Sequence, residues 1–153
     1  MDEFHLATLI LAALLIAASV IDMRTMRIPD ALNLALIVTG LAATWLLEKP
    51  MAPALIGVAL GYGALFLINQ LYRAARGRDG LGMGDAKLLA GAGAWLGWTG
   101  LPFVVLIGSA LGLCFVAARR IAGRTLKPGD ALAFGPFLCA AVLIVWLVQA
   151  AYS

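Results

Sequence analysis

Two aspartates at the edges of apolar stretches are the residues in this sequence best suited to chemistry. Asp22 closes one apolar run, and Asp85 opens another within the segment GMGDAK at residues 82–87. Ionisable groups at membrane depth are costly, so a functional role is the first hypothesis for each. Two carboxylates brought together can share a proton, one acting as a base on water and the other as an acid toward a carbonyl oxygen. This is the chemistry of aspartic proteases, and it needs no metal or cofactor.

Glycines precede the second aspartate. We expect Gly82 and Gly84 to allow unusual backbone angles and the close approach of another chain, such as an extended substrate strand. Asp85 would lie at a helix N-terminus, whose positive dipole end favours the carboxylate, and Asp22 at a helix C-terminus, whose negative end favours the protonated form. Asp85 is therefore expected to carry more of any shared negative charge.

The composition indicates a membrane protein. Hydrophobic residues make up 63% of the 153 positions and charged residues 12%, whereas soluble domains are about 45–50% apolar and about 25% charged. The net charge of +3 comes from short basic groups between apolar runs, which is typical of orientation signals. No continuous basic face with interleaved aromatics is present, so nucleic acid is not expected as a partner.

The apolar runs predict an all-α, polytopic membrane protein with about six transmembrane helices. The expected spans are residues 4–21, 31–47, 54–72, 85–96, 102–118 and 132–151. The segment from residue 85 to 118 is too long for one span, and GWTGLP supplies a Gly/Pro turn near its middle.

Basic residues indicate the orientation. With six spans, every Lys and Arg except Lys49 falls on the side that follows spans one, three and five. Basic residues favour the cytoplasm, so both termini are expected outside it and both aspartates near the cytoplasmic face. Five aromatic residues are expected at the outer interface, Trp45, Trp95, Trp98, Trp146 and Tyr152.

Glycines four residues apart predict close helix contacts. The pairs are Gly57 and Gly61, Gly93 and Gly97, and Gly108 and Gly112. Small residues at this spacing let helix backbones approach in lipid. The fourth span is rich in Ala and Gly and is expected to be the central helix.

Three segments resemble motifs of the type IV prepilin peptidases. DMRTMRIPD at 22–30 resembles their first aspartate motif, GMGDAK at 82–87 matches their GxGD motif and its following lysine, and FGPFL at 134–138 resembles a segment near the start of their last helix. Order, spacing and the six-span layout agree over essentially the whole chain. The resemblance implies a membrane-embedded aspartic endopeptidase. Such enzymes cut the leader from prepilins and pseudopilins at the cytoplasmic membrane face, after a glycine and before a hydrophobic helix.

The resemblance also implies the site residues. Asp22 and Asp85 would be the catalytic pair, and Gly82 and Gly84 would shape the site. Two residues on along a helix, Lys87 points away from Asp85, so it either shapes the site or reaches lipid headgroups. One further residue, Asp30, stands where asparagine is common and is a candidate for meeting a basic leader. No metal and no cofactor are implied, and the expected partners are the prepilin or pseudopilin substrate and membrane lipid.

The larger members of the family carry paired CxxC motifs in a cytoplasmic loop, with an N-methyltransferase activity. This chain has neither motif. We therefore expect a single transmembrane peptidase domain over residues 1–153 and no N-methyltransferase domain. It resembles the short branch that serves tight-adherence pili, in the bacterial cytoplasmic (inner) membrane. Other GxGD proteases pair the motif with Tyr-Asp and Pro-Ala-Leu segments, but here Ile21 precedes Asp22 and no Pro-Ala-Leu occurs.

Two other classes stay open. A small transporter or ion-pathway protein would use Asp22 and Asp85 as proton or cation sites. Such proteins usually place carboxylates near the bilayer midplane among broken helices, whereas both aspartates here are expected at one end. A membrane scaffold would carry them as boundary charges, and their replacement by asparagine would then be silent.

Overall fold

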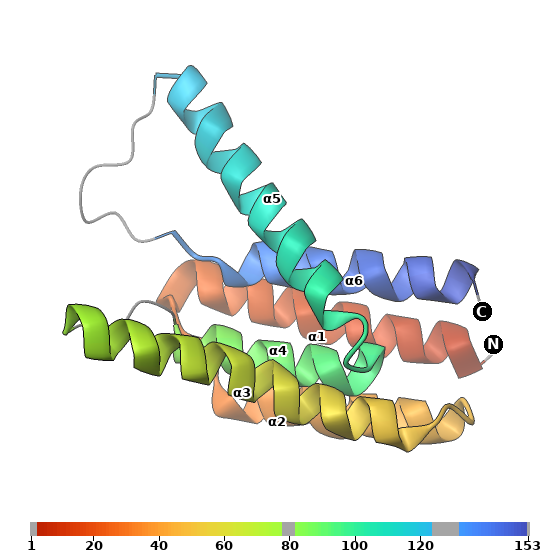
Figure 1. Ribbon diagram of the computed structural model, residues 1–153. Coiled ribbons are helices and arrows are strands. Elements are labelled where there is room, and N and C mark those ends of the chain that lie inside the picture. Colours follow the sequence, from red (N-terminus) through yellow and green to blue (C-terminus); the bar gives the residue numbers. More distant parts are fainter. Residues whose placement is uncertain (1–2, 78–81, 124–131, 153) are drawn as a thin grey trace.

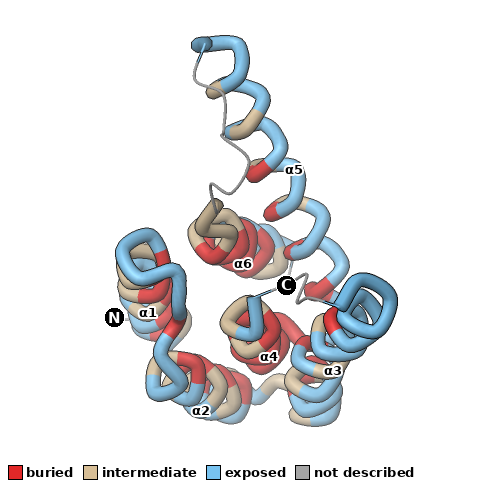
Figure 2. The backbone as a smooth tube through the Cα atoms, turned by 90° about the vertical axis from the view of Figure 1, so that its left-hand side faces the viewer, coloured by how far each residue is buried: buried red, intermediate tan, exposed pale blue. Residues whose placement is uncertain are grey.

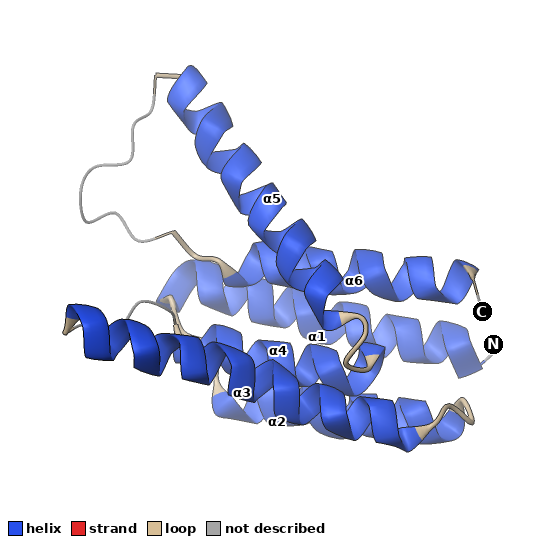
Figure 3. Ribbon diagram, viewed as in Figure 1, coloured by secondary structure: helices blue, strands red, loops and turns tan. Residues whose placement is uncertain are grey.

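The chain is helical throughout the part that the structure describes. The structure is a computed structural model that describes residues 3–77, 82–123 and 132–152, and these ranges contain six α-helices and no strand (Figure 3). The helices are α1 (Glu3–Thr25), α2 (Asp30–Leu46), α3 (Met51–Arg76), α4 (Met83–Leu96), α5 (Leu101–Ile121) and α6 (Gly135–Ala151). Each predicted span overlaps one helix, so the all-α prediction is confirmed for the described residues.

Three of these helices are long and apolar enough to cross a membrane, namely α1, α3 and α5. The helices α2 and α6 are apolar but have 17 residues each, and α4 has 14. At the usual helical rise α4 is about 21 Å long, whereas the hydrocarbon core of a bilayer is about 30 Å thick. The six crossings and the outside termini therefore stay predictions.

The helices run back and forth along one axis. Figure 1 shows both chain ends at one end of the bundle, while the C-termini of α1 and α3 and the N-termini of α2, α4 and α6 gather at the other. This second end brings together segments that are far apart in the sequence, including the two that carry the aspartates.

Helix α4 is the centre of the bundle. Figure 2 looks along the axis and shows α4 with α2, α3 and α6 packed around it. All residues from 88 to 96 are buried. Because this stretch consists largely of Ala and Gly, its neighbours can approach from several sides. The prediction that the fourth span is the central helix is confirmed.

The closest helix contact joins α3 and α4 at two glycines. A Cβ built on Gly93 would lie 2.2 Å from the backbone carbonyl of Gly57, and one on Gly61 would lie 2.4 Å from the carbonyl oxygen of Leu89. Only residues without a Cβ permit this approach. Gly97 lies at the same contact, since a Cβ built on Gly57 would also lie 2.9 Å from its carbonyl carbon, and it ends α4 with a φ of 70°.

Helix α5 leaves the bundle. Its buried residues, Leu101, Val104, Gly108 and Gly112, all lie in its first twelve positions, where it packs chiefly on α6. Beyond them it diverges from the other helices (Figure 1), and Leu113 and Ile121 are exposed. The glycines of its GxxxG pair face α6, as a helix contact requires.

Two of the five aromatics assigned to the outer interface are in the core instead. Trp45, Trp98 and Tyr152 are exposed, but Trp95 and Trp146 are buried, and their rings meet edge to face at 5.4 Å. Each indole N–H finds an internal acceptor, the Leu36 carbonyl oxygen for Trp95 and the Thr8 hydroxyl for Trp146, both at 2.9 Å. Because these donors are satisfied internally, the rings need no interface.

Candidate active site

The apolar stripe of α1 aims Asp22 into the bundle. The buried residues of this helix are Ala7, Leu11, Leu15, Ala18 and Asp22. Their spacing of three or four is that of one helix face. The helix continues to Thr25, one turn past the end predicted at residue 21, so Asp22 stands on the helix itself. It is 6% exposed.

Helix α6 begins directly at this carboxylate. The backbone N–H of Gly135, the first residue of α6, donates a hydrogen bond to Oδ2 of Asp22 at 3.0 Å. A Cβ at position 135 would lie 2.6 Å from the same oxygen. Since carbon cannot approach oxygen that closely without displacement, the contact requires glycine.

Asp85 stands in the first turn of α4. Its backbone N–H donates to the carbonyl oxygen of Gly82 at 3.1 Å, and its side chain is half-buried. Gly82 has an extended backbone with φ −66° and ψ 126°, and Gly84 lies within the helix, so neither has a positive φ. The expectation of unusual backbone angles at these glycines is therefore wrong. A Cβ at Gly82 would be in ordinary van der Waals contact with Oδ2 of Asp85, at 3.4 Å, so glycine leaves the volume beside this carboxylate open.

The helix ends beside the two aspartates do not indicate which of them carries more negative charge. Asp85 is at the N-terminus of α4, as predicted, and Asp22 is at the C-terminal turn of its own helix. However, Asp22 also faces the N-terminus of α6 through Gly135. Both carboxylates thus lie beside a positive helix end, and the one beside Asp22 comes from a neighbouring helix.

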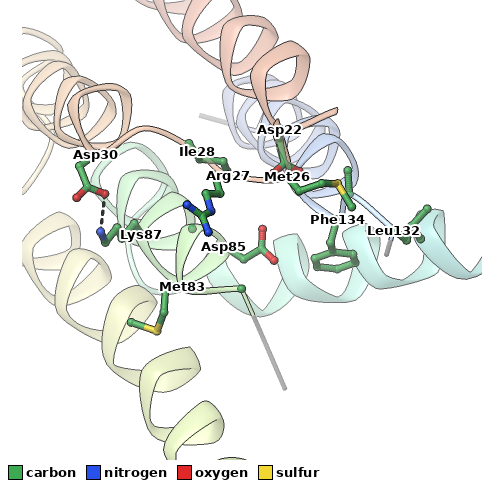
Figure 4. Close-up of a pocket in the computed structure, with 13 residues that line it drawn as sticks. Asp22, Met26, Arg27, Ile28, Asp30, Met83, Asp85, Lys87, Leu132 and Phe134 are labelled. Atoms are coloured by element: carbon green, nitrogen blue, oxygen red, sulfur yellow. Dashed lines mark hydrogen bonds and ion pairs between the residues drawn. The ribbon is translucent and has the colours of Figure 1, made fainter. Parts of the chain in front are cut away.

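One pocket contains every site residue that the sequence predicted. It has a volume of about 470 Å³ and is lined by Asp22, Asp30, Gly82, Gly84, Asp85 and Lys87, among others. Figure 4 shows the Asp85 carboxylate projecting toward the side of the pocket that holds Asp22 and Phe134. The structure thereby brings together two aspartates that the spans alone placed only at the same depth.

Lys87 forms an ion pair with Asp30. The pair joins α4 to α2, with side chains that are 35% and 78% exposed. Lys87 therefore points away from Asp85, as the helical spacing predicted (Figure 4). Lys87 thus lines the pocket while its ammonium group binds Asp30 of α2.

Several pocket residues were not predicted from the sequence. Arg27 extends toward Asp85 (Figure 4), and its guanidinium adds a positive charge to the pocket. The others are apolar or small, namely Met26, Ile28, Met83, Leu132, Ala133 and Phe134. Most of these unpredicted residues lie within or beside the three motifs quoted above, as does Gly135. Position in a motif was therefore the sequence signal that could have identified them. Within the described ranges no group of three or more His, Cys, Asp or Glu side chains could hold a metal ion.

Comparisons with known proteins show which family this chain resembles. A family model described as the type IV leader peptidase family matches residues 9–117, a range that includes both aspartates. A prepilin leader peptidase/N-methyltransferase of Burkholderia pseudomallei is 43% identical over 136 residues, covering 88% of this chain and 44% of the relative. No solved structure matches significantly.

More distant relatives carry the same name. The protein from Dickeya chrysanthemi is 41% identical over 87% of this chain and 47% of its own length. That from Neisseria gonorrhoeae is 37% identical over 92% of this chain and 48% of its own. This chain thus spans about half the length of the curated relatives it matches. With its long apolar helices it is an integral membrane protein, and it belongs to the type IV leader peptidase family.

Proposed function

We propose that this protein is a membrane-embedded aspartic endopeptidase that removes the leader peptide of type IV prepilins or pseudopilins. The observation that carries the proposal is the pocket at one end of the bundle, which two aspartates from different helices line together. The family and its curated relatives support the substrate class.

The two carboxylates would act as an acid/base pair. One, ionised, accepts a proton from water as that water attacks the scissile carbonyl carbon. The other, protonated, donates a hydrogen bond to the carbonyl oxygen as charge develops there. Protonation of the leaving amine then breaks the C–N bond. No metal or cofactor is needed for these steps, and Asp22 and Asp85 are the residues we assign to them.

The remaining pocket residues would bind and position the substrate. Gly82 leaves room beside Asp85 for an extended backbone, since a side chain there would reach toward the Asp85 carboxylate. Gly84 lies against Ile28, and both residues line the pocket. The carboxylate of Asp30 is largely exposed despite its ion pair, so it stays a candidate for contact with a basic leader.

We further propose that the active site faces the cytoplasm, in the bacterial inner membrane. The end of the bundle that carries the pocket also carries most of the described basic residues, Arg24, Arg27, Arg73, Arg76 and Lys87. Basic residues favour the cytoplasmic side. For the given residues, which contain no CxxC motif, we assign the peptidase activity, as in the branch that serves tight-adherence pili.

A cleavage assay with two variants tests the proposal. The purified protein in detergent is mixed with a candidate prepilin, and a leader-sized loss of mass is measured. Asp22→Asn and Asp85→Asn are each expected to reduce the cleavage rate about 10²–10⁴-fold, the usual contribution of a general acid or base. Glu48→Gln, the same chemical change in an exposed residue at the far end of the bundle, is the matched control.

The same assay separates the alternatives. Full cleavage by either aspartate variant would refute the acid/base pair. A transporter or ion pathway is not favoured, because both aspartates line a pocket at one end of the helices and not at mid-length.

A further inference from the structure

A second cavity adjoins the active-site pocket between α2 and α3. We name it the α2–α3 groove. It has a volume of about 640 Å³, and its base is formed by Lys87 and Ala90 of α4. Its walls are largely apolar, with Leu34 and Ile37 on α2 and Val58, Ala59 and Tyr62 on α3. The groove exists because α2 and α3 each pack more closely on α4 than on one another (Figure 2).

The groove borders the active-site pocket. Asp30 and Lys87 line both cavities, and the two side chains form an ion pair. An extended chain that leaves the groove at this point enters the pocket beside Asp85.

Asn33 is a buried polar residue with no partner in the described structure. It occupies the inward face of α2, which otherwise carries Leu36, Gly40, Ala43 and Thr44. Thr44 is satisfied by the carbonyl oxygen of Ala94 at 3.1 Å. Asn33 is only 2% exposed, yet neither its amide nitrogen nor its amide oxygen has a hydrogen-bond partner. Such a group is unfavourable in an apolar environment, so it points to a partner that binds from outside.

The chemistry of Asn33 indicates which partner. A carboxamide offers two donors and an acceptor, and a peptide group, with one N–H and one C=O, matches both functions. A lipid acyl chain offers neither. Asn33 lines the α2–α3 groove, although it is only 2% exposed.

We propose that the α2–α3 groove binds the apolar segment of the substrate polypeptide next to the scissile bond, with the Asn33 amide hydrogen-bonded to one of its peptide groups. This proposal rests on the proposed peptidase function. The apolar walls bury the substrate side chains, Asn33 holds the backbone, and the Asp30–Lys87 pair marks the point where the chain turns toward Asp85.

A blocked groove tests the proposal. Ala59 and Ala64 are both exposed on α3, but only Ala59 lines the groove. Two substrates are compared, a full prepilin and a short soluble peptide that spans the scissile bond without the apolar segment. Ala59→Trp is expected to lower the ratio of kcat/KM for the prepilin to that for the peptide at least tenfold, and Ala64→Trp to leave this ratio unchanged. An equal ratio in the two variants would overturn the proposal.

Asn33→Leu is the second variant. Removal of the amide is expected to lower kcat/KM for the prepilin about tenfold, the value of one hydrogen bond, with a smaller effect on the short peptide. The thermal midpoint should stay the same or rise, because two unsatisfied polar atoms are replaced by a similar volume of hydrocarbon. A lowered midpoint with equal losses on both substrates would instead show a structural role for Asn33.

Crosslinking separates failure of the groove from failure of the proposed function. Benzoylphenylalanine is placed at position 59 or 64 of an Asp85→Asn variant, which is then incubated with prepilin and illuminated. A crosslink from position 59 alone to the apolar segment supports the groove. If the wild type cleaves prepilin but position 59 gives no crosslink, the groove belongs to another occupant such as lipid. If the wild type cleaves neither substrate, the peptidase function fails, and the crosslink alone decides whether the groove binds the segment.

Discussion

Asp22 is a buried carboxylate whose position depends on one backbone donor and on the absence of one carbon atom. The N–H of Gly135 holds Oδ2, and no Cβ stands between them. In the sequence, Gly135 is one residue of the FGPFL segment, and nothing there indicates its role. Its contact with Asp22 spans most of the chain, so no local pattern predicts it.

Gly135→Ala should therefore impair catalysis without unfolding the protein. The added Cβ would lie 2.6 Å from Oδ2 of Asp22, and the carboxylate must move to relieve the contact. A displacement of this size from productive geometry is expected to reduce kcat about 10²-fold, measured as prepilin cleavage. The control is Gly63→Ala in α3, where an added Cβ meets nothing within 4 Å. Equal activity of the two variants would mean that this contact does not position Asp22.

The Asp30–Lys87 pair is expected to contribute little to stability. Asp30 is 78% exposed, and exposed ion pairs are worth about 0–1 kcal/mol because water and salt screen them. Asp30→Asn should thus shift the free energy of unfolding by less than about 1 kcal/mol, measured by chemical denaturation in detergent. A larger loss would show that the pair is a structural clamp between α2 and α4.

At the scale of the elements, α4 determines the packing of the molecule. It is short, rich in Ala and Gly, and buried through residues 88–96. Its N-terminus places Asp85 in the pocket, and its middle contacts the backbone of α3 at Gly57 and Gly93. The sequence could predict a close contact from glycine spacing, but not which helices meet, since several helices carry such glycines.

Gly93→Ala should separate α3 from α4. The new Cβ would lie 2.2 Å from backbone atoms of Gly57, which cannot move aside as a side chain can. Overpacking of this kind costs about 1–3 kcal/mol, visible as a lower thermal midpoint than that of the wild type. The control is Gly63→Ala on α3, where an added Cβ meets nothing within 4 Å. Its thermal midpoint should equal or exceed that of the wild type, because alanine favours the helix over glycine. Identical midpoints for the two variants would contradict the α3–α4 contact.

At the scale of the whole molecule, the two ends of the bundle differ in chemistry. One end carries the pocket and most of the basic residues, and the other carries both termini, with Trp45 and Trp98 exposed. This difference follows from the sequence, because antiparallel helices send alternate loops to opposite ends.

Labelling of single cysteines tests the orientation in cells. In a Cys114→Ser background, Glu48→Cys should react with a membrane-impermeant maleimide added outside the cytoplasmic membrane, because it lies in the loop between α2 and α3 at the end with the termini. Arg76→Cys, at the pocket end, should react only after the membrane is permeabilised. The reverse pattern would place the active site outside the cytoplasm. The remaining Cys139 is buried.

The sequence by itself determined the helices, their order and six of the residues that line the pocket. Apolar runs and Gly/Pro turns are local properties, so each predicted span overlaps a helix, and the motif segments supplied all six predicted pocket residues. Only the tertiary structure decided the contacts between distant segments: Gly135 against Asp22, Lys87 against Asp30, and two tryptophans in the core. The physical reason is that periodicity shows which face of a helix is buried, whereas the identity of its neighbour depends on how all the helices pack together.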